Sequence, residues 1–166
     1  MVPANDALGL LGRVRTSSLD MSHAMIGAIV GLIVLLVVAS IRESRRRRER
    51  MEALMSGVEA LTAEEFLRYT VPSAGEVTGV YVLHNVTSDR YYVGQSKCVL
   101  ARVRHHLTGS GNGDVYADYR RGDAFEVSVI SCARSGYTSI NALERDLIAH
   151  YDAYTRGYNK TAGNAG

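Results

Sequence analysis

The sequence contains few cysteines, and this scarcity excludes a fold held together by disulfides. Its two cysteines, Cys98 and Cys132, lie far apart and have no histidine at a spacing that would pair with them. Two cysteines are too few for a disulfide scaffold, and their spacing does not fit a structural zinc site. We interpret both as ordinary core or surface thiols in a reducing compartment.

A large excess of charge of one sign is also missing. The formal net charge is +2, and from Glu76 to the end 10 Lys and Arg stand against 9 Asp and Glu. Bulk charge therefore does not identify this part of the chain as a nucleic-acid-binding module. The sequence also has no internal repeat, no zinc-finger spacing and no evident helix-turn-helix, so we expect no attached domain that reads bases.

One long hydrophobic run dominates the N-terminal part of the chain. Residues 24–41, AMIGAIVGLIVLLVVASI, are eighteen residues without a charge. As a helix they reach about 27 Å, close to the ~30 Å hydrocarbon core of a bilayer. Six arginines follow directly within residues 42–50. Because translocating them is costly, they keep that end in the cytoplasm. We expect a single-pass membrane helix, in contact with lipid through residues 24–41, with the C-terminal part of the chain cytoplasmic.

This run has other possible interpretations. A signal peptide carries its positive charge before the apolar stretch, whereas here the charge follows it. A core helix would be amphipathic, but this run is apolar on all faces. The arginines could also bind nucleic acid or anionic lipid headgroups. A start at Met51 would remove the apolar run altogether, and this alternative stays open.

The chain divides into four segments on these patterns. We expect a flexible tail at 1–20, the transmembrane helix at 21–41, a basic stretch and helical linker at 42–75, and a compact domain at 76–166. Within the linker, apolar residues have helical spacing between Met51 and Phe66, and Thr62 followed by Glu65 is a capping box that opens a short helix. The stretch 71–75, VPSAG, ends it.

The compact domain reads as an α+β fold. Two runs rich in β-branched and aromatic residues, 78–86 and 90–96, predict a hairpin, and 124–132 predicts a third strand. Helices are predicted at 98–107, at 115–122 and, with a strong amphipathic pattern, at 139–154. The expected architecture is a three-stranded antiparallel sheet flanked by helices, behind the transmembrane helix.

Four polar and aromatic features of this domain are candidates for chemistry. Tyr81 and Tyr92 could meet across the hairpin if the strand register is suitable, although half-buried strand tyrosines are common. Arg102 and His106 are four residues apart on one helix face, and together they suit a phosphate. The alternative for this pair is a solvated basic helix face.

Glu144 and Asn159 complete the set of candidates. Glu144 falls inside the apolar stripe of the last helix, where a carboxylate is costly unless it is paired or binds a cation. It is therefore either a ligand for a hard divalent ion, an edge residue that reaches solvent, or a buried partner for Arg102. Asn159, in Gly157-Tyr158-Asn159, could cap a turn or hydrogen-bond a phosphate.

In combination, these residues resemble the GIY-YIG nuclease family over residues 77–161. The two signatures appear as Gly79-Val80-Tyr81 and Tyr92-Val93-Gly94, and four further family positions follow in the same order at Arg102, His106, Glu144 and Asn159. Two departures are visible. Val80 replaces the isoleucine of the first signature, and the loop GSGNGD lacks a second histidine that some members carry.

The resemblance implies a DNA endonuclease that hydrolyses phosphodiester bonds with one Mg²⁺ or Mn²⁺ held by Glu144. Together with the apolar run at 24–41, this gives the expectation of a membrane-anchored endonuclease. The resemblance further implies that Arg102 neutralises the scissile phosphate and that Tyr81 positions or deprotonates the attacking water. Tyr92, His106 and Asn159 would order water and phosphate. The implied partner is DNA, with relaxed sequence preference and no small-molecule cofactor. The alternative function is a weak or inactive module that binds DNA or a protein partner.

Overall fold

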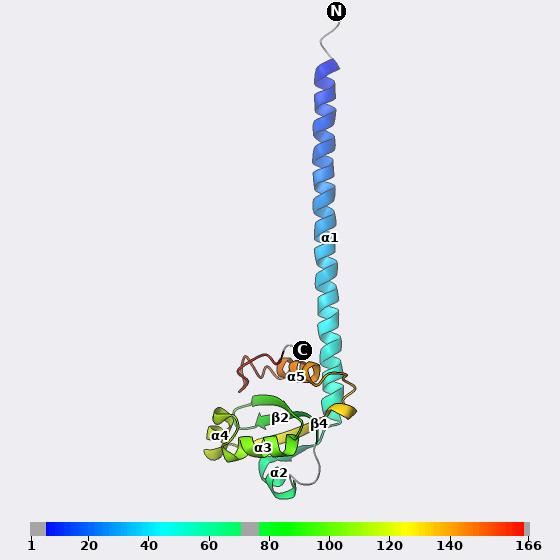
Figure 1. Ribbon diagram of the computed structural model, residues 1–166. Coiled ribbons are helices and arrows are strands. Elements are labelled where there is room, and N and C mark those ends of the chain that lie inside the picture. The colour runs from blue at the N-terminus through cyan, green and yellow to red at the C-terminus, as the bar shows by residue number, and fades with distance from the viewer. Residues whose placement is uncertain (1–5, 71–76, 165–166) are drawn as a thin grey trace, which may run out of the picture. The chain divides into compact units, whose positions relative to one another are not determined.

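The computed structural model describes residues 6–70 and 77–164, with side chains from His23 onward. It separates into two compact units, Met1–Arg46 and Arg47–Gly166. Helix α1 (Asp6–Ser56) contributes to both (Figure 1). The expected helix break at 71–75 lies outside the described residues.

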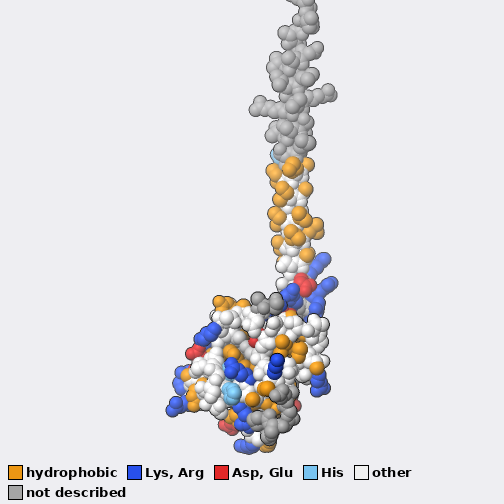
Figure 2. Space-filling view, in the orientation of Figure 1, with side chains coloured by type: hydrophobic (Ala, Val, Ile, Leu, Met, Phe, Trp, Pro, Cys, Tyr) orange, Lys and Arg blue, Asp and Glu red, His pale blue; other side chains and the backbone are white. Residues whose placement is uncertain are grey.

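The described part of the first unit is residues 6–46 of α1. Every side chain described in it, from His23 onward, is exposed, including the large apolar residues between Met25 and Ile41. Figure 2 shows these apolar side chains around the helix, with arginines after them. Among the described residues, this is the one helix long and apolar enough to cross a membrane. The helix already begins at Asp6, within the stretch expected as a tail.

The second unit is built on a four-stranded antiparallel sheet, one strand more than the sequence predicts. Its strands are β1 (Ala60–Thr62), β2 (Gly79–Asn85), β3 (Arg90–Ser96) and β4 (Phe125–Ser131), in the order β1-β4-β2-β3. The three-stranded expectation was wrong because β1 is only three residues long, too short for an alternating pattern to be recognised in the sequence. It exists through its pairing with β4, which joins Leu61 to Val127.

The helices of this unit follow the predicted pattern closely. They are α2 (Ala63–Tyr69), α3 (Val99–Thr108), α4 (Gly113–Arg120) and α5 (Ile140–His150), with a 3₁₀ turn at Cys132–Arg134. The capping box is confirmed, since the Thr62 side chain accepts from the Glu65 backbone while Glu65 reaches back to Thr62. Ser139 caps α5.

Side chains along each strand alternate between the two faces of the sheet, and each face has its own apolar core. Tyr81 and Leu83 point to one face of the sheet, where α2, α3 and α4 contribute to the core. Val80 and Val82 point to the opposite face and pack with α5. In Figure 1, α5 and α3 accordingly lie on opposite sides of the sheet. Met51, near the end of α1, is 2% exposed and belongs to the α5 core.

Candidate active site

The two tyrosines of the hairpin lie on the same face of the sheet. The β2–β3 register pairs Tyr81 with Gly94 and Leu83 with Tyr92, so the two tyrosines are diagonal neighbours. Their ring centroids are 6.1 Å apart. Their meeting depends on the strand register, and this register brings them together.

Gly94 makes room for the Tyr81 side chain. A Cβ atom at position 94 would stand 2.4 Å from the Tyr81 hydroxyl oxygen, well inside van der Waals contact. The tyrosine ring therefore crosses directly over the backbone of its cross-strand partner. This close approach is the local reason for a glycine at the end of Tyr92-Val93-Gly94.

His106 lies beneath both tyrosines and is fully buried. Its Nε2 is 2.9 Å from the Tyr81 hydroxyl, and its Nδ1 accepts a 2.8 Å hydrogen bond from the Asn112 backbone amide. Because Nδ1 accepts, the proton of the neutral ring is on Nε2. His106 therefore donates to the Tyr81 oxygen, and the Tyr81 proton is directed elsewhere.

His106 and Tyr81 are both uncharged near neutral pH. Burial, together with the nearby charge of Arg102, lowers the pKa of His106 to about 4. Burial and the neighbouring Tyr92 raise the pKa of Tyr81, although the Arg102 guanidinium opposes that rise. Burial also raises the pKa of Tyr92. Neither tyrosine is thus poised to lose its proton in this arrangement.

Arg102 is the exposed cation of the group. It lies one helical turn before His106 on α3, and its charge acts on Tyr81, Tyr92 and His106. Its side chain is exposed, whereas the histidine is buried. The two residues therefore differ in what they can do: Arg102 can meet an incoming anion, and His106 acts through Tyr81.

Glu144 is a buried carboxylate on the apolar face of α5. It is 7% exposed, and Oε2 accepts a 2.8 Å hydrogen bond from the Gln95 side chain. Within the described ranges 6–70 and 77–164, no ion pair joins it to Arg102. Of the three options raised by the sequence, the buried partner of Arg102 and the solvated edge residue both disagree with this environment.

A cleft of about 210 Å³ opens beside the carboxylate. Tyr92, Glu144, Asn112, Asn159 and Lys160 are among the residues that line it. Tyr81 and His106 are not in its lining, which agrees with their burial. Of the two tyrosines, Tyr92 is the one in the cleft wall.

The Asn159 side chain binds the backbone of the edge strand β3. Its Oδ1 accepts from the Val93 amide at 2.9 Å, and its Nδ2 donates to the Val93 carbonyl at 2.8 Å. The Tyr158 amide donates to the Tyr91 carbonyl at 2.9 Å, so the segment continues along the same edge. Asn159 thus holds the C-terminal loop against the strand that carries Tyr92.

A buried polar cluster, which the sequence analysis did not anticipate, supports this loop. The Tyr158 hydroxyl donates to Asp118 at 2.7 Å and accepts from Asn85 at 2.8 Å. The Arg90 guanidinium lies 4.1 Å from the centre of the Tyr158 ring. These residues come from β2, β3, α4 and the C-terminal loop and match no local motif, although the alternation of β2 does place Asn85 on the inner face with Tyr81.

The donor set suits a divalent cation that keeps most of its water. Among the described residues, no three His, Cys, Asp or Glu side chains converge on one point. A transition-metal site that needs several protein ligands is therefore unsupported there. Mg²⁺ is commonly bound through one or two carboxylates plus water and substrate phosphate, and a single buried Glu144 at the edge of a polar cleft fits that preference.

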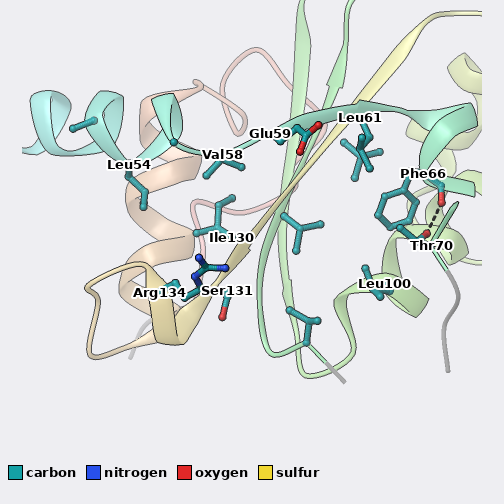
Figure 3. Close-up of a pocket in the computed structure, with 15 residues that line it drawn as sticks. Leu54, Val58, Glu59, Leu61, Phe66, Thr70, Leu100, Ile130, Ser131 and Arg134 are labelled. Carbon is teal, nitrogen blue, oxygen red and sulfur yellow. Dashed lines mark hydrogen bonds between the residues drawn. The ribbon is translucent and has the colours of Figure 1, made fainter. Parts of the chain in front are cut away.

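A larger hollow of about 800 Å³ lies elsewhere in the domain, away from these residues. It is mainly apolar and is lined by Leu54, Leu61, Phe66, Leu100 and Ile130, among others (Figure 3). Thr70 and Val77, which also line it, flank the stretch outside the described residues. None of the six candidate residues lines this hollow, so its size does not mark it as the active site.

This part of the chain matches a known protein family. The model of the GIY-YIG catalytic domain matches residues 77–159. Among solved structures, the chain is similar to the catalytic domain of the intron endonuclease I-TevI, determined as a mutant. Sequence identity is 19% and the TM-score 0.40, with 54% of this chain and 99% of that one covered. No curated protein gives a significant match.

Proposed function

The chain belongs to the GIY-YIG family, because the catalytic-domain match spans residues 77–159, and we propose that it is a metal-dependent DNA endonuclease anchored in a membrane. The observation that carries the catalytic part is the placement of a buried carboxylate, Glu144, which forms no ion pair with any described residue, in the same cleft wall as Tyr92. A buried carboxylate without a cationic partner is costly, and a bound cation removes that cost.

Arg102 would receive the scissile phosphate. Its guanidinium is exposed, permanently charged and next to both tyrosines. Charge-assisted hydrogen bonds from arginine to phosphate strengthen as negative charge develops in the transition state. We assign Arg102 to phosphate binding on this ground.

The tyrosines would order the attacking water. Tyr92 lines the cleft, while Tyr81 lies behind it and is fixed by the hydrogen bond from His106. Because the pKa of both phenols is raised, we assign them to holding the water rather than to removing its proton. His106 and Asn159 act as positioning residues, the first on Tyr81 and the second on the strand of Tyr92.

Glu144 would hold one Mg²⁺ or Mn²⁺. When bound, such an ion polarises the phosphate and stabilises the leaving oxygen. The hydrogen-bond partner of Glu144 is the neutral amide of Gln95, which does not compete with a cation for the carboxylate.

The catalytic proposal is tested by a cleavage assay on the full chain in detergent micelles. Plasmid and branched DNA are incubated with Mg²⁺ or Mn²⁺, with EDTA as the metal-free control. Wild type should cut only with metal, and Glu144→Gln and Arg102→Ala should each lose at least about 100-fold in rate, as expected for removing a metal ligand or a transition-state charge. Full activity in either folded variant contradicts the assigned roles. A folded wild type that binds DNA but cuts no substrate favours the binding-module alternative.

The membrane anchor rests on α1. Its residues from Met25 to Ile41 expose large apolar side chains, and an arginine-rich segment follows at 42–50. A helix of this kind is stable in a bilayer, and the arginines favour a cytoplasmic position for the catalytic domain.

Fractionation tests the anchor and its orientation. The full chain should stay in the membrane pellet after an alkaline carbonate wash, and protease added to the cytoplasmic face should digest residues 47–166. Release into the supernatant would exclude the span. Protection of the catalytic domain from that protease would reverse the proposed orientation.

A further inference from the structure

We infer that Gln95 is a positioning residue that orients the carboxylate of Glu144 for the divalent cation. The inference rests on the proposed function, since it presumes that Glu144 binds a metal. Gln95 directly follows Gly94 on β3 and was not among the residues that the sequence singled out. Its contacts, rather than its place in a motif, identify it.

The amide of Gln95 joins the edge strand to α5. Its Nε2 donates to Glu144 Oε2 at 2.8 Å and to Asn141 Oδ1 at 2.7 Å. An amide nitrogen has two hydrogens, so both are used. Asn141 and Glu144 are three residues apart on α5 and face the same way, which lets one amide fix both.

The strand register explains why the Gln95 side chain points toward α5. Gln95 pairs with Val80, whose side chain lies in the core on the α5 face, so the Gln95 side chain points to the same face. Tyr92, an odd number of positions away, points to the other face and reaches the cleft from there. The edge strand β3 thus contributes to the active site from both of its faces.

A glutamine donor fixes the carboxylate without cancelling its charge. Oε2 is held by Gln95, and Oε1 forms no hydrogen bond within the described residues. A lysine or arginine in place of Gln95 would neutralise the carboxylate and compete with the cation. Removing a residue that hydrogen-bonds a metal ligand, without touching the metal itself, commonly weakens metal affinity by about 10- to 100-fold.

The test measures Mn²⁺ binding directly, on the full chain in detergent micelles, by the electron paramagnetic resonance signal of free Mn²⁺. Gln95→Met keeps the length of the side chain but removes its donor, and it should raise the Kd for Mn²⁺ by about 10- to 100-fold. Gln95→Asn keeps the amide but is one methylene shorter, so it should also weaken binding. Asn141→Ala removes only the second acceptor and should change the Kd less than about threefold.

Cleavage kinetics give a second measurement. If Gln95 acts on metal binding, Gln95→Met should need more Mn²⁺ for half-maximal cleavage and should recover most of its kcat at saturating Mn²⁺. Thermal melting of the metal-free chain is recorded in parallel. If Gln95→Met does not fold, the Gln95→Asn affinity decides the question.

The outcomes separate this inference from the proposed function. If wild type and Glu144→Gln bind Mn²⁺ equally, Glu144 is not the metal ligand and both fail. If Glu144→Gln loses binding but folded Gln95→Met and Gln95→Asn keep it, the proposed function stands and the role of Gln95 is refuted. An Asn141→Ala Kd as weak as that of Gln95→Met would also refute it, because the bond to Glu144 would then not be decisive.

Discussion

Gly94 offers a direct test of how tightly the site is packed. In Gly94→Ala, the new Cβ meets the Tyr81 hydroxyl at 2.4 Å, and the ring is too buried to move away freely. We expect a loss of about 1–3 kcal/mol in unfolding free energy, the usual size for overpacking, together with a severe loss of cleavage. Denaturant unfolding followed by near-ultraviolet circular dichroism measures the first, and the plasmid assay the second.

Gly113→Ala is the matched control. A Cβ at position 113, the first residue of α4, meets nothing within 4 Å. This variant should keep both stability and activity, because alanine is the better helix former. Equal behaviour of the two alanine variants would show that Tyr81 is not confined by the strand opposite.

His106 makes the stability of the domain depend on pH. Its pKa is about 4 in the folded state against 6.5 for the free side chain, so the unfolded chain binds the extra proton first. This contribution to stability is complete above about pH 6.5 and is lost as the pH falls toward 4. Between pH 7 and pH 5 the loss amounts to about 2 kcal/mol.

His106→Gln tests this linkage, because glutamine can donate and accept but does not titrate. In each protein, the unfolding free energy at pH 5 is subtracted from that at pH 7. This pH-dependent loss should be about 2 kcal/mol smaller in the variant than in wild type. Parallel pH profiles for the two proteins would mean that folding does not lower the pKa of His106.

The sequence predicts those features of single residues that depend on local patterns, but not their contacts with residues far away in the chain. The sequence places Glu144 in an apolar stripe, since a 3.6-residue period is a local property, and the carboxylate is buried. It does not reveal Gln95, because a lone glutamine has no pattern and its partner lies 49 positions away. The contact of Asn159 with Val93, across 66 positions, is hidden for the same reason.

At the scale of elements, the linker before the family match is part of the fold. Met51 and Phe66 are 2% and 1% exposed, and β1 covers the outer edge of β4. Burying one such side chain contributes about 1.5–3 kcal/mol, a sizeable part of the 5–15 kcal/mol typical of a domain. We therefore expect a fragment of residues 47–166 to fold, and one of 77–166 to be several kcal/mol less stable or insoluble.

Urea unfolding and amide proton dispersion in NMR spectra compare the two fragments. A cooperative transition in both, at the same midpoint, would mean that residues 47–76 add nothing to the core. Activity should follow stability, because no candidate catalytic residue lies before Tyr81.

The elements that the sequence predicts are those with local patterns. The hairpin of β2 and β3, the capping box at Thr62 and the stripe of α5 each arise from neighbouring residues. Strand β1 lacks such a pattern and is stabilised by pairing with β4, some sixty positions later. Residues 6–20 belong to helix α1, whereas the sequence predicts a tail there because its residues show no periodicity.

At the scale of the whole molecule, the small net charge limits how firmly DNA can be held. Lys160 is the lysine in the wall of the Glu144 cleft, and its side chain is 75% exposed. We expect Lys160→Ala to weaken DNA binding and to reduce the salt-dependence slope by about one ionic contact. Fluorescence anisotropy with labelled duplex at several salt concentrations measures both.

Arg156→Ala is the control for Lys160. Its side chain is similarly exposed, at 80%, and forms an ion pair with Asp152 as Lys160 does with Asp114, but it lines a different hollow, beside Tyr91 and Tyr151. Its salt slope should match that of wild type. Equal slopes for all three proteins would place the DNA contact away from the Glu144 cleft.

The attachment of Asn159 to Val93 has a consequence for molecules crowded side by side. β3 is the outermost strand of its sheet, and such an edge can recruit a strand from a neighbouring molecule. Under the proposed membrane anchor, neighbouring molecules would share one plane and meet often, so an open edge would invite self-association. By occupying the Val93 amide and carbonyl, the asparagine amide blocks that pairing. An Asn159→Ala variant could therefore become inactive through aggregation while its chemistry is intact, and its oligomeric state has to be known before its activity is interpreted.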